Sequence, residues 1–154
     1  MVLTHGAGGI RPAWKPGTPV LIKDHLNLTG TTPIEGASFI DMTDIYTPQL
    51  RQIAKSVDPS LGEGVIAQVP GPQYETAAEV QMLRGQGADM VGASVALEAM
   101  AARQAGMDVL GLTLITNQAA GISPTPLSHR EVLEAGAQAE PRVSALLAKI
   151  LEQL

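Results

Sequence analysis

Cysteine is absent from the sequence, so neither a disulfide framework nor a thiolate metal site can form, and no cysteine nucleophile is available. Charged residues are also scarce, at 16% of the chain, and the formal net charge is -5. This composition lacks the basic face that binds a nucleic acid or an anionic membrane surface. The sequence has no apolar run long enough to span a bilayer, and its first residues do not resemble a leader peptide. We therefore expect a cytoplasmic protein that binds neither nucleic acids nor membranes.

Apolar residues make up 45% of the 154 residues, which is enough for one hydrophobic core, and no linker or change of composition divides the chain. We therefore expect a single domain over residues 1–154. Short apolar runs alternate with segments of helical periodicity. Expected strands cover residues 19–23, 64–69, 89–92 and 109–115, while expected helices cover 76–85 and 96–106 and begin near residues 48 and 128. This alternation predicts an α/β fold with a mostly parallel or mixed central sheet flanked by helices.

Capping patterns predict where the helices begin. Thr47 precedes Pro48, a residue favoured at the first helical position. Thr76 with Glu79, and Ser128 with Glu131, have the spacing of a capping box, in which each side chain binds a free backbone N–H of the other residue. Pro141 predicts that the last helix kinks or breaks before it, because the proline ring removes a hydrogen bond.

The N-terminal residues have an unusual order for an intact domain. Val2-Leu3-Thr4 followed by Gly6-Ala7-Gly8-Gly9 is typical of the end of a buried strand running into a glycine-rich loop, yet almost no strand precedes it. A short edge strand would explain this order. We favour a partial domain whose N-terminal strands are missing, and expect an exposed sheet edge at residues 2–4.

Polar clusters follow the expected strands at their carboxyl ends, where α/β sheets bind ligands. Taken singly, each cluster is weak evidence, because an asparagine at a strand end is more often a turn residue and a glutamate before a helix is usually solvated. Their convergence on one edge of the sheet predicts a binding site. The clusters are Gly6 to Gly9, Gln73-Tyr74-Glu75-Thr76, Gly92-Ala93-Ser94 and Thr116-Asn117.

Five segments resemble the motifs of one enzyme family, in the same order along the chain. Residues 3–10 are similar to its Thr-Asn-Ala-Ala-Gly-Gly segment, 24–27 to Asp-His-(Leu/Ile)-Asn, 71–76 to Gly-Pro-X-(Tyr/Phe)-Glu-Thr, 87–94 to Gly-Ala-Asp-X-Val-Gly-Met-Ser, and 114–117 to (Leu/Val)-(Ile/Val)-Thr-Asn. The family is the trimeric class of purine nucleoside phosphorylases. The chain resembles the C-terminal part of such an enzyme.

The resemblance implies reversible phosphorolysis of purine ribonucleosides and 2′-deoxyribonucleosides, as in purine salvage, giving the free base and the (2-deoxy)ribose 1-phosphate. Inorganic phosphate is then a co-substrate, and neither a cofactor nor a metal is expected. Glu75 and Asn117 are the implied catalytic residues, Glu75 at N1–H and the 2-amino group and Asn117 at the N7/O6 edge, where contacts strengthen as the leaving purine gains charge. The implied substrate-binding residues are Tyr74, Ala7, Gly8, Ala93, His129 at the ribose 5′-hydroxyl, and Phe39; the implied phosphate-binding residues are Gly6 and Ser94.

Each of these residues also has an ordinary structural explanation. His129 can be a surface residue in the first turn of its helix, and Tyr74 a packing lid beside a turn. Phe39 lies in a long irregular segment at residues 29–41, of a kind that often has a function. It can anchor its own loop in the core, or it can reach the ribose pocket of a neighbouring subunit in a homotrimer, which the resemblance implies for the complete protein.

The sequence departs from the family pattern in ways that leave alternatives open. His5 replaces an asparagine and Ala93 a methionine, and the family's phosphate-binding Gly-Ser-Gly loop and Arg-X-His segment have no counterpart here. One alternative is an inactive remnant that binds purines weakly or serves only in assembly. Another is activity like that of methylthioadenosine phosphorylases, which resemble this family but carry aspartate at the position of Asn117 and an apolar residue at that of His129. These two residues favour 6-oxopurines.

Overall fold

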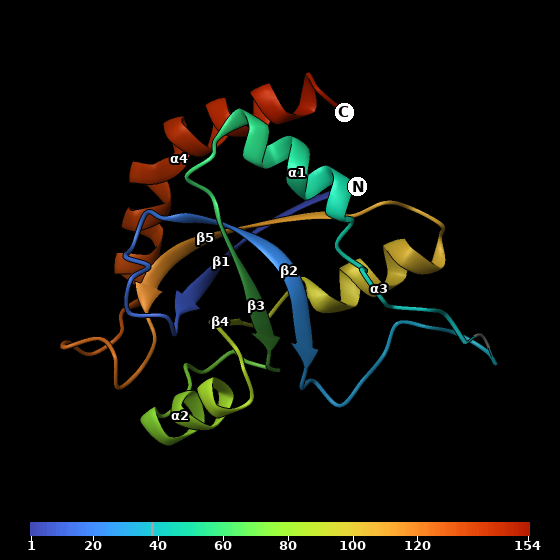
Figure 1. Cartoon of the computed structure of the whole chain (residues 1–154). Coiled ribbons are helices and arrows are strands. Elements are labelled where there is room, and N and C mark those ends of the chain that lie inside the picture. The colour runs from blue at the N-terminus through green and yellow to red at the C-terminus, as the bar shows by residue number, and fades with distance from the viewer. Residues whose placement is uncertain (38) are drawn as a thin grey trace.

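The structure is a computed structural model that describes residues 1–37 and 39–154. Five strands and four helices alternate along these residues, so the predicted α/β class is confirmed (Figure 1). None of the described helices is both long and apolar enough to cross a membrane. The elements are β1 (Val2–Gly9), β2 (Pro19–Asn27), α1 (Pro48–Val57), β3 (Gly62–Gln68), α2 (Ala77–Gly85), β4 (Met90–Gly92), α3 (Ala96–Gln104), β5 (Leu110–Gln118) and α4 (His129–Leu151).

The strands form one mixed sheet that closes on itself. Their order is β1-β4-β3-β2-β5, and β5 pairs in turn with β1, so the sheet is a barrel. The pairs β1/β5, β2/β3 and β3/β4 are parallel, whereas β1/β4 and β2/β5 are antiparallel. The mixed arrangement agrees with the sequence prediction, but closure of the sheet was not foreseen.

Closure changes the account of the first strand. β1 pairs along its whole length with β5, and its last residues Gly8 and Gly9 also pair with Val91 and Met90 of β4. The sheet therefore closes only at the end of β1. Within the described residues, Val2 to Ala7 have ladder partners on β5 alone, so the expected open edge at residues 2–4 is confirmed.

The predicted glycine-rich loop at residues 6–9 is also wrong, because these residues complete β1. The glycines permit close approach of neighbouring segments. A Cβ atom at Gly6 would stand 2.8 Å from Cγ2 of Thr116, and one at Gly9 would stand 3.2 Å from the carbonyl oxygen of Trp14. Glycine is therefore required here by packing on β5 and on the segment after β1, rather than by a turn.

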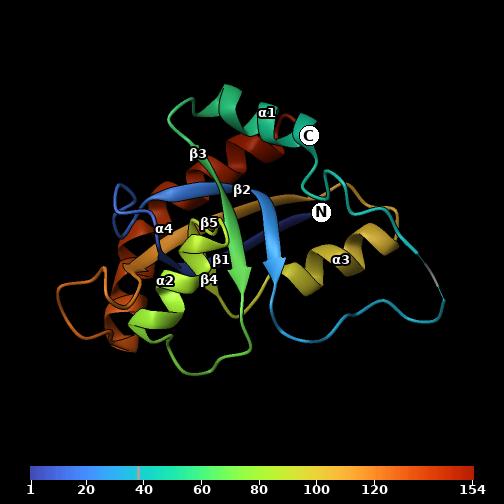
Figure 2. The same cartoon turned by 60° about the horizontal axis from the view of Figure 1, so that its bottom comes forward.

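The helices lie around the sheet in separate places. α1 and α4 lie together on one side, α3 lies on the other, and α2 stands at the end of the sheet where β3 finishes (Figures 1 and 2). Ile22, Ile66 and Ile115 are fully buried in one apolar cluster with residues of α3. A second cluster joins α2 to β3 and β4, and a third joins α1 and α4 to β2 and β5. These contacts hold the strand ends, and the segments that follow them, in fixed positions.

Helix ends agree only in part with the capping patterns. The capping box at Thr76 is confirmed, because its hydroxyl accepts from the Glu79 amide at 3.2 Å and its amide donates to the Glu79 carboxylate at 2.7 Å. Thr47 precedes α1, but its side chain bonds Asp108 and the Val109 amide instead of capping the helix. The structure thus uses Thr47 to join α1 to the start of β5.

The last helix departs from its predicted capping box and from the predicted break, while the alternative of a kink before Pro141 stays a prediction. Ser128 makes no side-chain capping bond, and α4 continues through Pro141 to Leu151. A proline inside a helix costs about 3 kcal/mol because one backbone hydrogen bond is lost. Burial of Leu146 and Ile150 against the sheet offsets this cost, since fully burying such a side chain contributes about 1.5–3 kcal/mol.

Candidate functional site

A cavity of about 310 Å³ lies where the ends of β1, β4 and β5 meet the start of α4. Its volume is at the small end of the range for sites that bind small molecules. Nine of the ten site residues predicted from the sequence line it, so the predicted convergence of the polar clusters is confirmed. These nine residues are Gly6, Ala7, Gly8, Tyr74, Glu75, Ala93, Ser94, Asn117 and His129, and the remaining lining residues are Gly71, Pro72, Gln73, Val91, Gly92, Thr116 and Val132.

The side-chain amide of Asn117 is held by hydrogen bonds on both of its atoms. Its Oδ1 accepts a 2.9 Å hydrogen bond from the hydroxyl of Thr116, and its Nδ2 donates at 3.1 Å to the carbonyl of Gln118. A Cβ atom at Gly8 would stand 3.3 Å from Nδ2, so β1 packs directly on this amide. Since Nδ2 carries two hydrogens, one of them stays available for a ligand in the cavity. Thr116 orients Asn117 through this hydrogen bond, a role that the sequence alone does not indicate.

Glu75 is half-buried in the wall formed by the segment between β3 and α2. Burial raises the pKa of its carboxyl group, and the nearby charge of Glu79 acts in the same direction. The capping box at Thr76 fixes the chain directly after Glu75. A carboxylate that has lost part of its water shell forms stronger bonds to N–H donors than an exposed one does. Glu75 is therefore suited to bind a ligand that offers N–H groups.

His129 and Tyr74 line the same cavity from other elements. His129 is the first residue of α4, and it is exposed, as the surface interpretation expects, yet it borders the cavity. Tyr74 is 41% exposed, so it is not a residue that packs fully against the protein interior. Both side chains are exposed beside the cavity, which suits contacts to a sugar or to the face of a base.

The turn between β4 and α3 forms another wall and carries Ala93 and Ser94. Val95 follows them with a φ of 96°, a left-handed conformation that is rare for a β-branched residue and costs about 1–3 kcal/mol. Such a conformation persists only where neighbouring groups fix it. The amide of Val95 donates to the Glu98 carboxylate at 2.8 Å, and the buried side chain of Gln68 bonds the residues on either side. Sequence reasoning missed Gln68; its only signal was one amide in an apolar strand.

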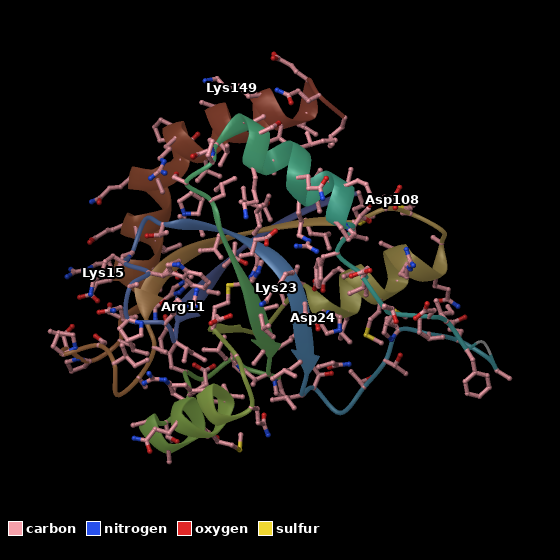
Figure 3. All side chains as sticks on the ribbon, in the orientation of Figure 1. Arg11, Lys15, Lys23, Asp24, Asp108 and Lys149 are labelled. Carbon is pink, nitrogen blue, oxygen red and sulfur yellow. The ribbon has the colours of Figure 1, made fainter. Side chains whose placement is uncertain are left out.

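None of the described residues that line the cavity is a lysine or an arginine. Lys23 stands on β2, as Figure 3 shows, and Arg103 donates from Nε to the carbonyl of Asp41 at 3.3 Å. Neither residue borders the cavity. Within residues 1–37 and 39–154, no group of three or more His, Asp or Glu side chains is arranged to hold a metal ion.

Residues 1–152 match the family model described as "Phosphorylase superfamily". The chain belongs to the phosphorylase superfamily. A relative named purine nucleoside phosphorylase from Cellulomonas sp is 60% identical over 153 residues, which cover 99% of this chain and 54% of the relative. The protein of the same name from Mycobacterium tuberculosis is 56% identical over 151 residues, covering 98% of this chain and 56% of the relative. The chain thus spans about half the length of the curated relatives it matches.

Solved structures agree with this membership. The Schistosoma mansoni purine nucleoside phosphorylase in complex with inosine superposes with a TM-score of 0.92 at 32% identity, and the match covers 99% of this chain and 60% of that one. A schistosome purine nucleoside phosphorylase in complex with hypoxanthine gives the same TM-score and identity, with 61% of that chain covered. The resemblance inferred from the five motifs is therefore confirmed, as is the fold that it implied.

His5, where this phosphorylase-superfamily chain departs from the asparagine pattern, does not line the cavity. Its Nδ1 donates to the Gly6 carbonyl at 3.1 Å, so in the neutral ring Nε2 accepts from the Thr113 hydroxyl at 2.8 Å. Thr113 is fully buried. Burial lowers the pKa of His5 to about 4, although the Gly6 bond and the charge of Glu98 oppose the shift. Neutral His5 therefore joins β1 to β5 through its bond to Thr113.

We expect the folded chain to lose stability as the pH falls from about 6.5 to about 4. His5 takes up a proton in the unfolded chain near pH 6.5 but in the folded chain only near pH 4. Its contribution is therefore complete above pH 6.5 and is lost on acidification, by about 2–3 kcal/mol in total. Burial also lowers the pKa of His25, which adds to the loss. The free energy of unfolding, measured with urea, should differ less between pH 7 and pH 4.5 for His5→Asn than for the wild type. An equal difference in the two proteins would contradict this role of His5.

Phe39 is the one predicted site residue that the structure places outside the cavity. Its side chain is 101% exposed, so the interpretation of Phe39 as a core anchor for its own loop is wrong. The adjacent Ser38 lies outside the described residues.

Proposed function

We propose that the protein carrying this chain catalyses reversible phosphorolysis of 6-oxopurine ribonucleosides and 2′-deoxyribonucleosides, as a step of purine salvage in the cytoplasm. The observation that supports it best is that Glu75 and Asn117, from separate segments, line one cavity together with the glycines of β1. An acceptor and an available amide donor in one small cavity match the N1–H and N7 positions of a 6-oxopurine. The relatives named above are purine nucleoside phosphorylases, and a schistosome neighbour is described in complex with inosine.

In the proposed reaction, a phosphate oxygen forms a bond to the anomeric carbon of the sugar while the bond to N9 of the purine breaks. The electron pair of that bond goes to the purine, where negative charge spreads toward N7 and O6, and the proton that hydrogen phosphate loses on forming the ester balances the proton that the released base takes up. Asn117, with its Oδ1 held by Thr116, donates from Nδ2 to this edge. Glu75 accepts from N1–H. The donated bond strengthens as charge develops, so it lowers the barrier more than it improves substrate binding.

The remaining cavity residues are assigned to the sugar and the phosphate. His129, at the start of α4, binds the 5′-hydroxyl, and Tyr74 covers the base or the ribose. Ala93 is assigned to the ribose, together with Ala7 and Gly8 of the neighbouring β1. Gly6 and Ser94 are assigned to inorganic phosphate, the co-substrate, because a backbone N–H and a hydroxyl both donate hydrogen bonds to phosphate oxygens.

The decisive experiment is a phosphate-dependent assay of the full gene product. Release of hypoxanthine from inosine should need phosphate and should exceed release of adenine from adenosine or methylthioadenosine. Equal or faster turnover of methylthioadenosine would replace the proposal with the methylthioadenosine phosphorylase alternative. Hypoxanthine binding without turnover would support the inactive remnant instead.

Changing Asn117 to aspartate should shift the preference between bases. A carboxylate repels the O6/N7 edge of a 6-oxopurine but accepts a hydrogen bond from a 6-amino group. We expect kcat/KM for inosine to fall about 10- to 100-fold, on the scale of losing a hydrogen bond and adding a repulsion, while the ratio of adenosine to inosine turnover rises. The same assay with the two nucleosides measures both effects. An unchanged ratio would remove Asn117 from the base site.

We further propose that the active protein is a homotrimer in which Phe39 enters the ribose pocket of a neighbouring subunit. Its full exposure in the single chain supports this assignment, because an exposed phenylalanine in a long loop gains by burial against a partner. Phe39→Ala should raise the KM for inosine about tenfold and leave the cavity of its own chain intact. Light scattering alongside the assay tests the assembly, and an active monomer would end the proposal.

A further inference from the structure

Gln68 has a buried polar side chain next to the cavity, and the proposed chemistry gives this side chain no role. Gln68 is the last residue of β3, is 4% exposed, and does not line the cavity. Its Nε2 donates to the carbonyl of Ala93 at 3.3 Å. Its Oε1 accepts from the backbone amides of Ala96 at 2.6 Å and Leu97 at 3.3 Å. One side chain thus binds both ends of the turn between β4 and α3.

The three partners determine the orientation of this amide. Two N–H groups at the start of α3 require an oxygen, and the Ala93 carbonyl requires an N–H donor. If the amide were turned around, its NH2 group would face the two N–H groups and its oxygen would face the carbonyl. The two amides are also among those at a helix N-terminus that lack an intrahelical acceptor. Gln68 therefore supplies a side-chain cap from β3, because Val95, the residue that precedes α3, makes no side-chain capping bond.

The turn needs this support because its backbone is strained. Val95 has a φ of 96°, and the turn also packs on a second left-handed residue, since a Cβ atom at Gly71 would stand 3.1 Å from Cβ of Ala93. Glu98 holds the Val95 amide from inside α3. Gln68 holds the carbonyl before the strained residue and the amides after it. Without these bonds, nothing else among the described hydrogen bonds fixes the Ala93 carbonyl.

We propose that Gln68 is a positioning residue that fixes the turn at residues 92–95 and so holds Ser94 and Ala93 at the sugar and phosphate end of the cavity. The assignment of that end rests on the proposed function; the fixing of the turn rests on the hydrogen bonds alone. Glu75 and Asn117, which are assigned to the base, lie on other segments. Gln68 therefore governs binding of the sugar and leaves binding of the free base unchanged.

The test compares Gln68→Met, which keeps the length of the side chain but removes its polar atoms, with Gln86→Met, a matched change at an exposed position. Nuclear magnetic resonance titrations of the 154-residue chain, which detect weak binding, give the affinities for inosine and hypoxanthine. In Gln68→Met we expect affinity for inosine to fall about tenfold, the usual effect of leaving buried groups unpaired, while affinity for hypoxanthine stays within about twofold. Equal losses for both ligands, or no loss, would overturn the proposal.

The amide signals of Ala93 and Ser94 provide a readout that does not need a ligand. They should shift or broaden in Gln68→Met and stay unchanged in Gln86→Met. If the wild-type chain bound neither ligand, the proposed function would still be decided by the assay of the full gene product, and these signals alone would decide the role of Gln68. Gln68→Glu serves if the methionine variant unfolds, because it keeps an acceptor for Ala96 and Leu97 but loses the donor to Ala93, so the Ala93 and Ser94 signals should move in this variant as well. Unmoved signals in the folded variant would contradict the proposal.

Discussion

Replacing Glu75 with alanine in the active protein should lower kcat/KM for inosine by about 100-fold or more. The variant loses a charged hydrogen-bond acceptor in the half-buried wall of the cavity. A hydrogen bond to a charged group contributes about 1.5–3 kcal/mol. Loss of about 3 kcal/mol of transition-state stabilisation corresponds to slightly more than a 100-fold change in rate. An unchanged kcat/KM would show that the base binds elsewhere.

Stability separates this effect from general damage to the fold. Because burial raises the pKa of Glu75, the ionised carboxylate is less stable in the folded chain than in water. Glu75→Ala should therefore not lower the free energy of unfolding at pH 7, whereas activity collapses. Glu140→Gln, at an exposed position on α4, is the matched control and should change neither quantity. A Glu75→Ala variant as unstable as it is inactive would indicate a structural role.

Sequence periodicity was sufficient to predict most strands and helices, because each is a local pattern, but it missed the part of β1 that consists of glycine and alanine. It was also sufficient to bring Glu75, Asn117 and the glycines of β1 to one edge, since these residues lie at or just beyond the carboxyl ends of strands in a partly parallel sheet. Closure of the barrel was out of reach. It depends on the pairing of residues 2–9 with 110–118, about a hundred residues away, for which a single sequence carries no local signal.

The errors at helix ends and at Gln68 have a related cause. The Ser128 pattern fits a capping box, but a hydrogen bond depends on side-chain orientation, and the structure leaves this one unmade. The local rule that proline ends a helix does not hold at Pro141, because burial of the apolar face of α4 outweighs it. Gln68 acts on residues 25 to 29 positions away in the chain. Its spacing from them resembles no motif, so its role becomes visible only when β3, β4 and α3 are in place.

The 154-residue chain by itself should show no measurable phosphorolysis of inosine, while it binds hypoxanthine weakly. The reaction requires a phosphate dianion to be bound and aligned with the anomeric carbon, and such positioning can contribute about 7–11 kcal/mol of barrier lowering. Among the described residues that line the cavity, His129 is the one side chain able to carry positive charge, and it is assigned to the 5′-hydroxyl. Ser94 and the backbone of Gly6 remain for phosphate, and two neutral donors compensate little of its charge.

Base binding makes smaller demands, and its parts are present in the chain. The Asn117 amide is held by Thr116 and Gln118, and Glu75 lines the same cavity from a different segment. The measurement is a phosphate-dependent coupled assay beside a calorimetric titration with hypoxanthine, with Glu75→Ala as the control that should abolish the binding heat. Turnover within a few-fold of the Cellulomonas relative would contradict the expectation. It would then require a cationic phosphate site formed by residues outside the cavity lining, and Lys23 and Arg103 would be the first to change to alanine, because neither is committed to the base or the sugar.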